Sequence, residues 1–347
     1  MSELFVQQYE TVSGHQIFQI PTFAFPGFMV NVFVVFAGEY LVLIDTGSGF
    51  GEANADLESG VDQIGHMISN SFSLESITHV LMTHAHIDHF GGLPFVLEHS
   101  NAKVGIHEYD RRILAHYEES LALASMRLEQ FFIEAGVNHD RVIKLLDLYR
   151  INKELFHSIP VDFTYADEGM QVGPFEIIHV PGHTAGHVMF RIDGMVFAGD
   201  HILEDISPHQ APEQLTLSTG ISHYVASLRA AQSWLNDDNL IFTGHKGPLR
   251  HGKARIDAII DVHKKRLADV LALCREPITI SEISQRLFRD VSGYNVLLAL
   301  EETGAHVEYL YQIGLLKITN IDEVEKAECS LPIHYIANST TDYQILI

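Results

Sequence analysis

The stretch that most restricts how this chain can fold is Thr-His-Ala-His-Ile-Asp-His-Phe-Gly-Gly, residues 83–92. It follows the short apolar run ITHVLM, residues 77–82, which predicts a buried strand. Imidazole and carboxylate groups are common ligands of zinc and related divalent metals. A core would have to desolvate these polar groups without gain, so we interpret the stretch as a loop of metal ligands that follows a strand. The candidate ligands within it are His84, His86, Asp88 and His89.

Four other polar residues stand where an apolar run ends. They are Asp45 in VLIDTG, His183 in HVPGHTAGH, Asp200 in VFAGDHIL and His245 in IFTGHKGP. Each alone fits a turn or a helix cap. Since each follows a predicted strand, we expect all four to meet the histidine loop at one edge of a sheet.

Asp45 begins the stretch Asp-Thr-Gly-Ser, residues 45–48, which is also typical of aspartic proteases. Those enzymes need two such turns, because their reaction uses a pair of carboxylates that share a proton. The chain has no second Asp-Thr-Gly or Asp-Ser-Gly. We therefore interpret Asp45, together with Thr83, as a residue that holds the histidine loop through hydrogen bonds, and not as a nucleophile or a direct ligand.

Composition restricts the possible partners. The 347 residues include 22 histidines, as many as lysine and arginine together, and the formal net charge is −23. Nucleic-acid binding needs a basic surface, so nucleic acid is not an expected partner. No apolar stretch approaches the roughly 20 residues that span a bilayer, and the first residues lack the pattern of a signal peptide. These features, with Cys274 and Cys329 as the two thiols, predict a cytoplasmic protein without membrane contact.

Strand and helix patterns alternate along most of the chain, which predicts an α/β fold with two sheets between layers of helices. Residues 108–158 form a helical insertion in this pattern. After about residue 277 the pattern changes to two helices, with a break expected at Gly304, and a short strand, the order of a winged helix. Outside these two segments, strands are expected within 15–44, 77–84, 103–107, 170–200 and 239–245, and helices over 51–70, near 93–97 and over about 252–275.

The ordered set of motifs resembles the metallo-β-lactamase superfamily over about residues 15–270. The resemblance rests on Asp45-Thr-Gly, the His-x-His-x-Asp-His motif of residues 84–89, and then His183, Asp200 and His245. It implies an αββα sandwich with a metal site at the open edge of its two sheets.

The stretch PGHTAGH, residues 181–187, and residues 244–271 also resemble a lactamase-like subfamily whose members end in a winged helix. Residues 1–270 are then the catalytic domain, with the helical insertion 108–158. Residues 271–347 are a small winged-helix-like C-terminal domain.

The resemblance also implies a site for two divalent metal ions, with Zn²⁺ favoured and Mn²⁺ and Fe²⁺ as alternatives. Two ions about 3.5–4 Å apart can hold a hydroxide between them as the nucleophile. Asp88 and Asp200 are the implied catalytic residues: Asp88 orients the attacking water and can pass its proton to the leaving group, and Asp200 bridges the ions. The implied ligands are His84, His86 and His183 for the first ion, Asp88, His89 and His245 for the second, and Asp200 for both.

Three positions separate the chain from particular branches of this superfamily. Asp200 is usually absent from true metallo-β-lactamases. Leu203 stands where lactone-cleaving quorum-quenching members have tyrosine, and His86 stands where diiron oxygen-reducing members have glutamate. Our first hypothesis is therefore a binuclear hydrolase whose metal-bound hydroxide attacks an ester, a thioester or a lactone-like small molecule.

Two other functions stay open. Some relatives with the winged-helix tail are single-strand ribonucleases, so the same metals would cleave phosphodiesters. A non-enzymatic adaptor would bind a partner through the tail. The basic residues within 250–275 alternate with aspartates, and residues 276–320 are acidic on balance, so we interpret the winged helix as a packing or dimerisation module. A homodimer is therefore a possible state.

The substrate pocket is less well defined by the sequence. Phe25 and Phe28, in the stretch 21–31, are candidates for an apolar groove, and core packing explains them equally well. His187 and His223 are further candidates, with a supporting or surface role as the alternative. The apolar insertion would cap the pocket or form a dimer interface.

Overall fold

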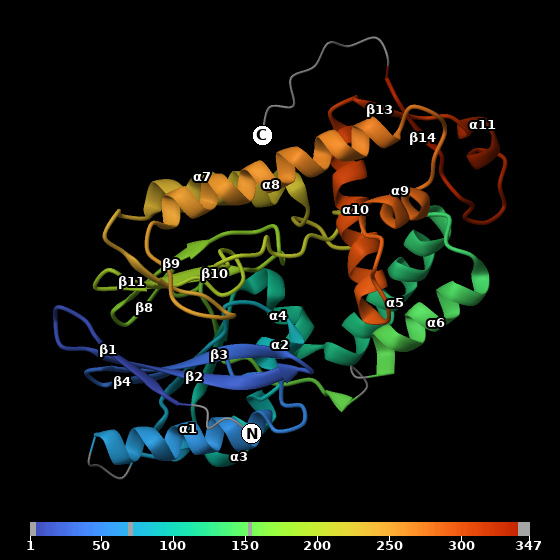
Figure 1. The fold of residues 1–347 in the computed structure, drawn as a ribbon. Coiled ribbons are helices and arrows are strands. Elements are labelled where there is room, and N and C mark those ends of the chain that lie inside the picture. Colours follow the sequence, from blue (N-terminus) through green and yellow to red (C-terminus); the bar gives the residue numbers. More distant parts are fainter. Residues whose placement is uncertain (1–4, 69–71, 152–154, 339–347) are drawn as a thin grey trace. The chain divides into compact units, whose positions relative to one another are not determined.

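The structure is a computed structural model that describes residues 5–68, 72–151 and 155–338 of the chain (Figure 1). The chain forms two compact units. We call them the sheet unit, residues 1–117, 158–208 and 228–256, and the helical unit, residues 118–157, 209–227 and 257–347. Each unit has its own buried apolar cluster.

The sheet unit contains a mixed seven-stranded sheet whose strands lie side by side in sequence order. Strands β1 to β4 pair antiparallel, and β4 to β7 pair parallel. The long strands β2 and β3 turn at Gly27, whose φ of 79° is a conformation that glycine adopts without steric cost. The strands are β1 (Gln7–Glu10), β2 (Gln16–Phe25), β3 (Phe28–Ala37), β4 (Tyr40–Ile44), β5 (His79–Leu81), β6 (Lys103–Ile106) and β7 (Phe163–Thr164).

A five-stranded sheet belongs to the same unit, in the order β12-β11-β10-β9-β8. Only β11 and β12 pair parallel; the other pairs are antiparallel. The strands are β8 (Gln171–Val172), β9 (Phe175–His179), β10 (Val188–Ile192), β11 (Met195–Phe197) and β12 (Leu240–Phe242). The helices that lie wholly within this unit are α1 (Ala53–Met67), η1 (Leu74–Ser76), α2 (Ile87–Phe90), α3 (Leu93–His99) and α4 (Glu108–Ala115).

The two sheets pack face to face around one apolar core. Side chains such as Phe33 of β3 and Phe197 and Phe242 of the second sheet belong to one buried cluster, with ring centroids 5.2–5.3 Å apart. On the opposite face of the first sheet, α1 comes so close to β2 that a Cβ on Gly60 would lie 2.4 Å from Ile20. Figure 1 shows α1 and α3 on this outer face. The predicted α/β fold with two packed sheets is confirmed.

The helical unit is built from α5 (Tyr117–Glu134), α6 (His139–Ile151), α9 (Ile280–Leu287) and α10 (Tyr294–Gln312), with most of α8 (Gly252–Leu273) and the first half of α7 (Ile221–Trp234). A short antiparallel pair, β13 (Leu316–Ile318) with β14 (Tyr335–Ala337), and α11 (Ile321–Val324) complete it. Within the described ranges, every helix is too short or too polar to cross a bilayer.

The compact units divide the chain differently from the predicted boundary at residue 270. Phe131, Phe132 and Val142 from the predicted insertion share one buried cluster with Leu297 and Leu300 of α10. The insertion therefore packs into the same core as the C-terminal segment. This packing could not be predicted from the sequence, because an apolar helix face does not show which other helix it will contact.

The predicted helix break at Gly304 is wrong, since α10 runs unbroken through this residue. A Cβ at this position would lie 2.8 Å from the ring of Phe131. Gly304 therefore serves close packing of two helices, one of the reasons for which a glycine is found inside a helix.

We expect Gly304→Ala to lower the free energy of unfolding by about 1–3 kcal/mol, because the added methyl group overpacks the ring of Phe131. Helix propensity alone would raise stability by about 1 kcal/mol. Denaturant unfolding measures the change, with the exposed Asn295→Ala on the same helix as a control for propensity. A stabilised Gly304→Ala variant would contradict the packing explanation.

Candidate metal centre

All seven predicted ligands lie in the sheet unit, just beyond the carboxyl ends of strands or in the short helix that follows. His84 and His86 come after β5, and Asp88 and His89 lie in α2. The other three come from the second sheet: His183 follows β9, Asp200 follows β11 and His245 follows β12. Both sheets thus contribute ligands to one place.

The ligand atoms form three overlapping groups in which all of them lie within 4.8 Å of one another. The structure therefore brings together every residue predicted as a ligand, and Asp200 and His89 lie near both predicted sets. The groups are His84, His86 and His183; His84, His89 and Asp200; and Asp88, His89 and His245.

The carboxylate of Asp200 lies between the two predicted sets. Its Oδ2 is 3.7 Å from Nε2 of His183 and 3.2 Å from Nε2 of His245. Its Oδ1 is 3.4 Å from Nε2 of His89. This position suits a carboxylate that contacts two cations at once.

Hydrogen bonds determine which ring nitrogen two of the histidines offer. Thr83 Oγ1 donates to Asp45 Oδ2 at 2.7 Å, so it accepts from Nδ1 of His84 at 2.9 Å. Nδ1 of His89 donates to the same carboxylate at 2.8 Å. In both rings Nδ1 is taken up by its hydrogen bond, so Nε2 is the nitrogen that can bind a metal after it loses any proton.

A hydrogen bond at Nδ1 also orients His245, and its partner belongs to the first sheet. Its Nδ1 donates to the carbonyl oxygen of Met29 at 2.6 Å, and its Nε2 lies 3.4 Å from Asp88 Oδ2. The ring of Phe28 lies against the imidazole, with centroids 4.2 Å apart. The β2–β3 hairpin thus positions a ligand that comes from the other sheet.

These residues fit a divalent metal ion. Nε2 of His84, Nε2 of His89 and Oδ1 of Asp200 are buried and have no hydrogen-bond partner among the described residues. Buried polar atoms are seldom left unsatisfied in folded proteins. Cations held between these nitrogen and oxygen atoms would satisfy them, and the donor set suits zinc or a related metal.

Burial and neighbouring charges shift the pKa values of several groups in the centre. Burial and the neighbouring histidines hold the pKa values of His84 and His86 well below the ordinary range. Burial also lowers the pKa of His245, but Asp200 and Asp88 outweigh it and raise the value to about 10. Burial raises the pKa of Asp88, yet His89 and His245 bring it down to about 2. The carboxylate of Asp88 is therefore ionised at neutral pH and attracts positive charge.

Asp45 lies where it can brace the histidine loop. Besides the two bonds at Oδ2, its Oδ1 accepts a hydrogen bond from the backbone N–H of Thr83 at 2.8 Å. Its own φ is 58°, a strained value for a residue other than glycine. Asp45 therefore contacts the candidate ligand His89 and also Thr83, the residue before the candidate ligand His84. Its hydrogen bond to His89 is made with Nδ1 and not with Nε2.

Asp110 is a supporting residue that the sequence did not reveal. It is fully buried in α4, and burial raises its pKa although hydrogen bonds lower it in part. It accepts hydrogen bonds from the backbone N–H of Ala85 at 2.9 Å, from Thr184 Oγ1 at 2.7 Å and from the backbone N–H of Gly186 at 2.7 Å. One carboxylate therefore joins the loop of His84 and His86 to the loop of His183. The available sequence evidence was weak: a single acidic residue shortly after a predicted strand.

The four residues predicted to bind substrate lie in different surroundings. Phe28 packs on His245, and Phe25 lies near Phe50, with ring centroids 6.2 Å apart. His187 is fully buried, and its Nε2 accepts a hydrogen bond from the backbone N–H of Asp200 at 3.1 Å, so it supports a ligand. His223 lies in the helical unit, where its Nε2 is 3.0 Å from Glu213 Oε1.

Comparisons with known proteins identify the family of the chain. The sequence profile of the metallo-beta-lactamase superfamily matches residues 25–245. A probable metallo-hydrolase of Bacillus subtilis (strain 168), YqjP, is 25% identical over 288 residues, which cover 79% of this chain and 85% of the relative. A hydroxyacylglutathione hydrolase of Shewanella sp. (strain ANA-3) is 24% identical over 209 residues, 54% of this chain and 66% of the relative. These relatives support a hydrolase.

Solved structures show the same fold. A metallo-beta-lactamase family protein from Thermus thermophilus has a TM-score of 0.72 at 24% identity, with 93% of this chain and 98% of the other covered. A beta-lactamase domain protein from Burkholderia ambifaria has a TM-score of 0.70 at 20% identity, with 96% and 94% covered.

Asp45→Asn should weaken metal binding about 10–100-fold while the protein still folds, because an amide cannot accept all three hydrogen bonds of the carboxylate. Competition with a chromophoric chelator measures the affinity, and circular dichroism measures folding. Asp62→Asn, an exposed position on α1, controls for the lost charge. An affinity equal to that of the control would show that Asp45 does not hold the ligands.

Asp110→Asn should lower both the metal affinity and the stability of the metal-free protein, the latter by about 1–3 kcal/mol, because an amide has one acceptor oxygen and leaves at least one of the three buried donors without an acceptor. Thr184→Val, which removes one of the three hydrogen bonds, should have a smaller effect of the same kind. Unfolding in a chelator and metal titration separate the two losses. An Asp110→Asn variant with unchanged metal affinity would exclude the bracing role.

Proposed function

The chain belongs to the metallo-beta-lactamase superfamily, and from this premise we propose that it is a binuclear metal-dependent hydrolase of an ester, a thioester or a lactone-like small molecule. The observation that carries the proposal is the position of Asp200. Its two oxygens face histidines of both predicted ligand sets, at 3.2–3.7 Å. A site for one ion would not need a carboxylate in this position.

The first ion would be held by His84, His86 and His183, the second by Asp88, His89 and His245, and Asp200 would contact both. When bound, the ions would lower the pKa of a water molecule toward neutrality and polarise the carbonyl oxygen of the substrate. Nitrogen and oxygen ligands in this number favour Zn²⁺, with Mn²⁺ and Fe²⁺ as alternatives.

The side chains of the protein then have separate tasks. Asp88 stays ionised, so it can accept a hydrogen bond from the attacking water and hold it in line with the carbonyl carbon. Asp45 and Asp110 keep the ligand loops in place. Phe28, packed on His245, offers an apolar surface beside the reacting group.

A thioester is the substrate class that the relatives favour. Hydroxyacylglutathione hydrolases from Shewanella sp. and from Haemophilus influenzae are 24% and 25% identical to this chain over 209 and 171 residues. Those names describe an acyl group cleaved from glutathione. For this chain we propose only the thioester bond, and not the glutathione part of the substrate.

We also propose that the C-terminal segment is a winged-helix-like module that packs or dimerises. α9 and α10, followed by the β13–β14 pair, have the order of such a module. The helix α10 carries Glu301, Glu302 and Glu308 and no lysine or arginine. This charge disfavours a ribonuclease or a DNA-reading role.

The test is hydrolysis by the protein after its metals are removed and restored. A panel of a glutathione thioester, p-nitrophenyl acetate and a γ-lactone should show activity only in the restored protein. Asp88→Asn should lower kcat by about 10²–10⁴-fold, and Asp62→Asn should not. Activity that survives metal removal would overturn the proposal. Cleavage of single-stranded RNA, with none of the three small substrates hydrolysed, would favour the phosphodiesterase alternative.

A further inference from the structure

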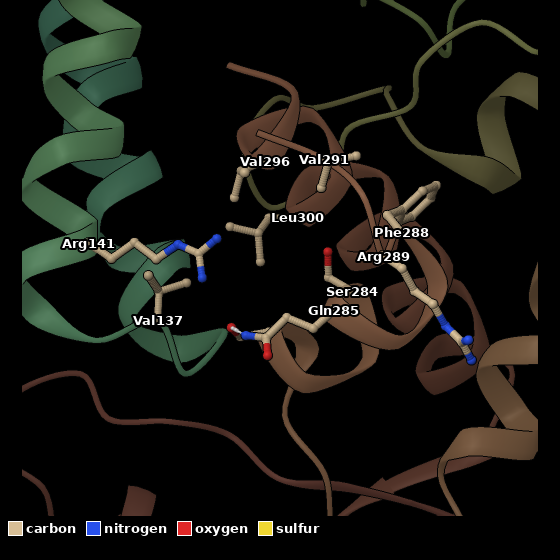
Figure 2. A pocket seen from close by; sticks show the side chains of 10 residues that line it. Val137, Arg141, Ser284, Gln285, Phe288, Arg289, Val291, Val296 and Leu300 are labelled. Carbon is tan, nitrogen blue, oxygen red and sulfur yellow. Dashed lines mark hydrogen bonds between the residues drawn. The ribbon is translucent and has the colours of Figure 1, made fainter. Parts of the chain in front are cut away.

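A cavity of about 370 Å³ lies within the helical unit, and none of its lining residues belongs to the metal centre. Its walls come from the loop before α6 and the first turn of that helix, from α9 and the loop after it, and from α10 (Figure 2). The volume falls within the range of small-molecule sites, about 300–1,000 Å³. The cavity is therefore large enough for a small organic ligand.

The charge of this cavity is opposite to that of the chain. Arg141 and Arg289 are among its ten lining residues, and none of the ten is acidic, although the whole chain has a net charge of −23. Figure 2 shows the guanidinium of Arg141 pointing into the cavity, whereas that of Arg289 points away from it. The guanidinium of Arg141 makes no hydrogen bond or ion pair with any residue that the structure describes. A guanidinium in such a place is suited to a carboxylate or a phosphate.

Polar groups of α9 lie opposite Arg141. Ser284 is only 5% exposed, and its hydroxyl points into the cavity (Figure 2). That hydroxyl forms no hydrogen bond with the described part of the chain, so it can donate one to a ligand. Gln285 and Ser281 are already joined by a hydrogen bond of 3.3 Å, which fixes the amide at the cavity wall.

The N-terminus of α10 also favours an anion in this cavity. Its N-cap is Gly293, which provides no side chain to cap the first backbone N–H groups, and Val296 in its first turn lines the cavity. The N-terminus of a helix of 19 residues carries a partial positive charge that favours an anion.

The remaining wall is apolar. Val137 and Leu300 are buried, Val296 is half-buried, and Phe288 closes one side. We propose that this cavity binds a small organic anion, whose carboxylate or phosphate pairs with Arg141 and Ser284 and whose short apolar end contacts Val137 and Leu300. The proposal does not depend on the reaction at the metal centre.

Methyl NMR of the metal-loaded full-length protein tests it with butyrate, monobutyl phosphate and, as the neutral control, butanol. Saturable shifts are expected at the methyl groups of Val137, Val296 and Leu300 with one or both anions and not with butanol. The anion that binds more tightly identifies the head group. Binding of either anion at the metals would shift other methyl groups, so the two sites are separated by the readout.

Arg141→Gln should weaken the saturable shifts at these methyl groups at least about tenfold, and Ser284→Ala should weaken them less. Lys144→Gln, an exposed position on the same helix, removes the same charge and should have no effect. Unfolding curves without ligand check that each variant is folded. Equal binding in Arg141→Gln and Lys144→Gln, equal shifts with butanol, or no saturable shift at these methyl groups up to tens of millimolar anion would each overturn the proposal.

Discussion

The carboxylate of Asp45 accepts three hydrogen bonds, and the geometry of the metal centre depends on them. One comes from the backbone of Thr83, one from its hydroxyl, and one from the ring of His89. Through Thr83 the same carboxylate also sets the ring of His84. A strained backbone at Asp45, with φ at 58°, is tolerated because the surrounding bonds determine it. Asp110 has the corresponding task between the loop of Ala85 and the loop of Gly186.

A second histidine cluster, in the helical unit, has a different arrangement of hydrogen bonds. His263, Glu302 and His306 are buried and close enough to hold an ion. Their atoms, however, are largely engaged with one another: His263 Nδ1 lies 3.1 Å from His306 Nε2, and His306 Nδ1 donates to the carbonyl oxygen of Glu302. Arg266 pairs with the Glu302 carboxylate at 2.7 Å. Both ring nitrogens of His306 are thus engaged, whereas His84 and His89 in the sheet unit form these hydrogen bonds with Nδ1 alone.

The sequence was sufficient to predict the α/β layers and the set of residues that converge, because each ligand stands at the end of an apolar strand. It could not identify Asp110, since two of its three partners are backbone N–H groups that leave no pattern in the sequence. The prediction of a helix break at Gly304 was wrong, because a glycine is needed there for close packing against the ring of Phe131, which is distant in the sequence. The sequence also did not predict which segments form the helical unit, because tertiary packing decides which apolar helix faces meet.

Our proposed function requires that two metal ions bind among these residues, with Asp200 in contact with both. Anomalous diffraction from crystals of the metal-loaded protein, recorded at the absorption edge of the metal, tests it most directly. The account predicts two peaks, one among Nε2 of His84 and the side chains of His86 and His183, the other among Asp88, His89 and His245, each in contact with an oxygen of Asp200. A single peak, or peaks outside these residues, would contradict it.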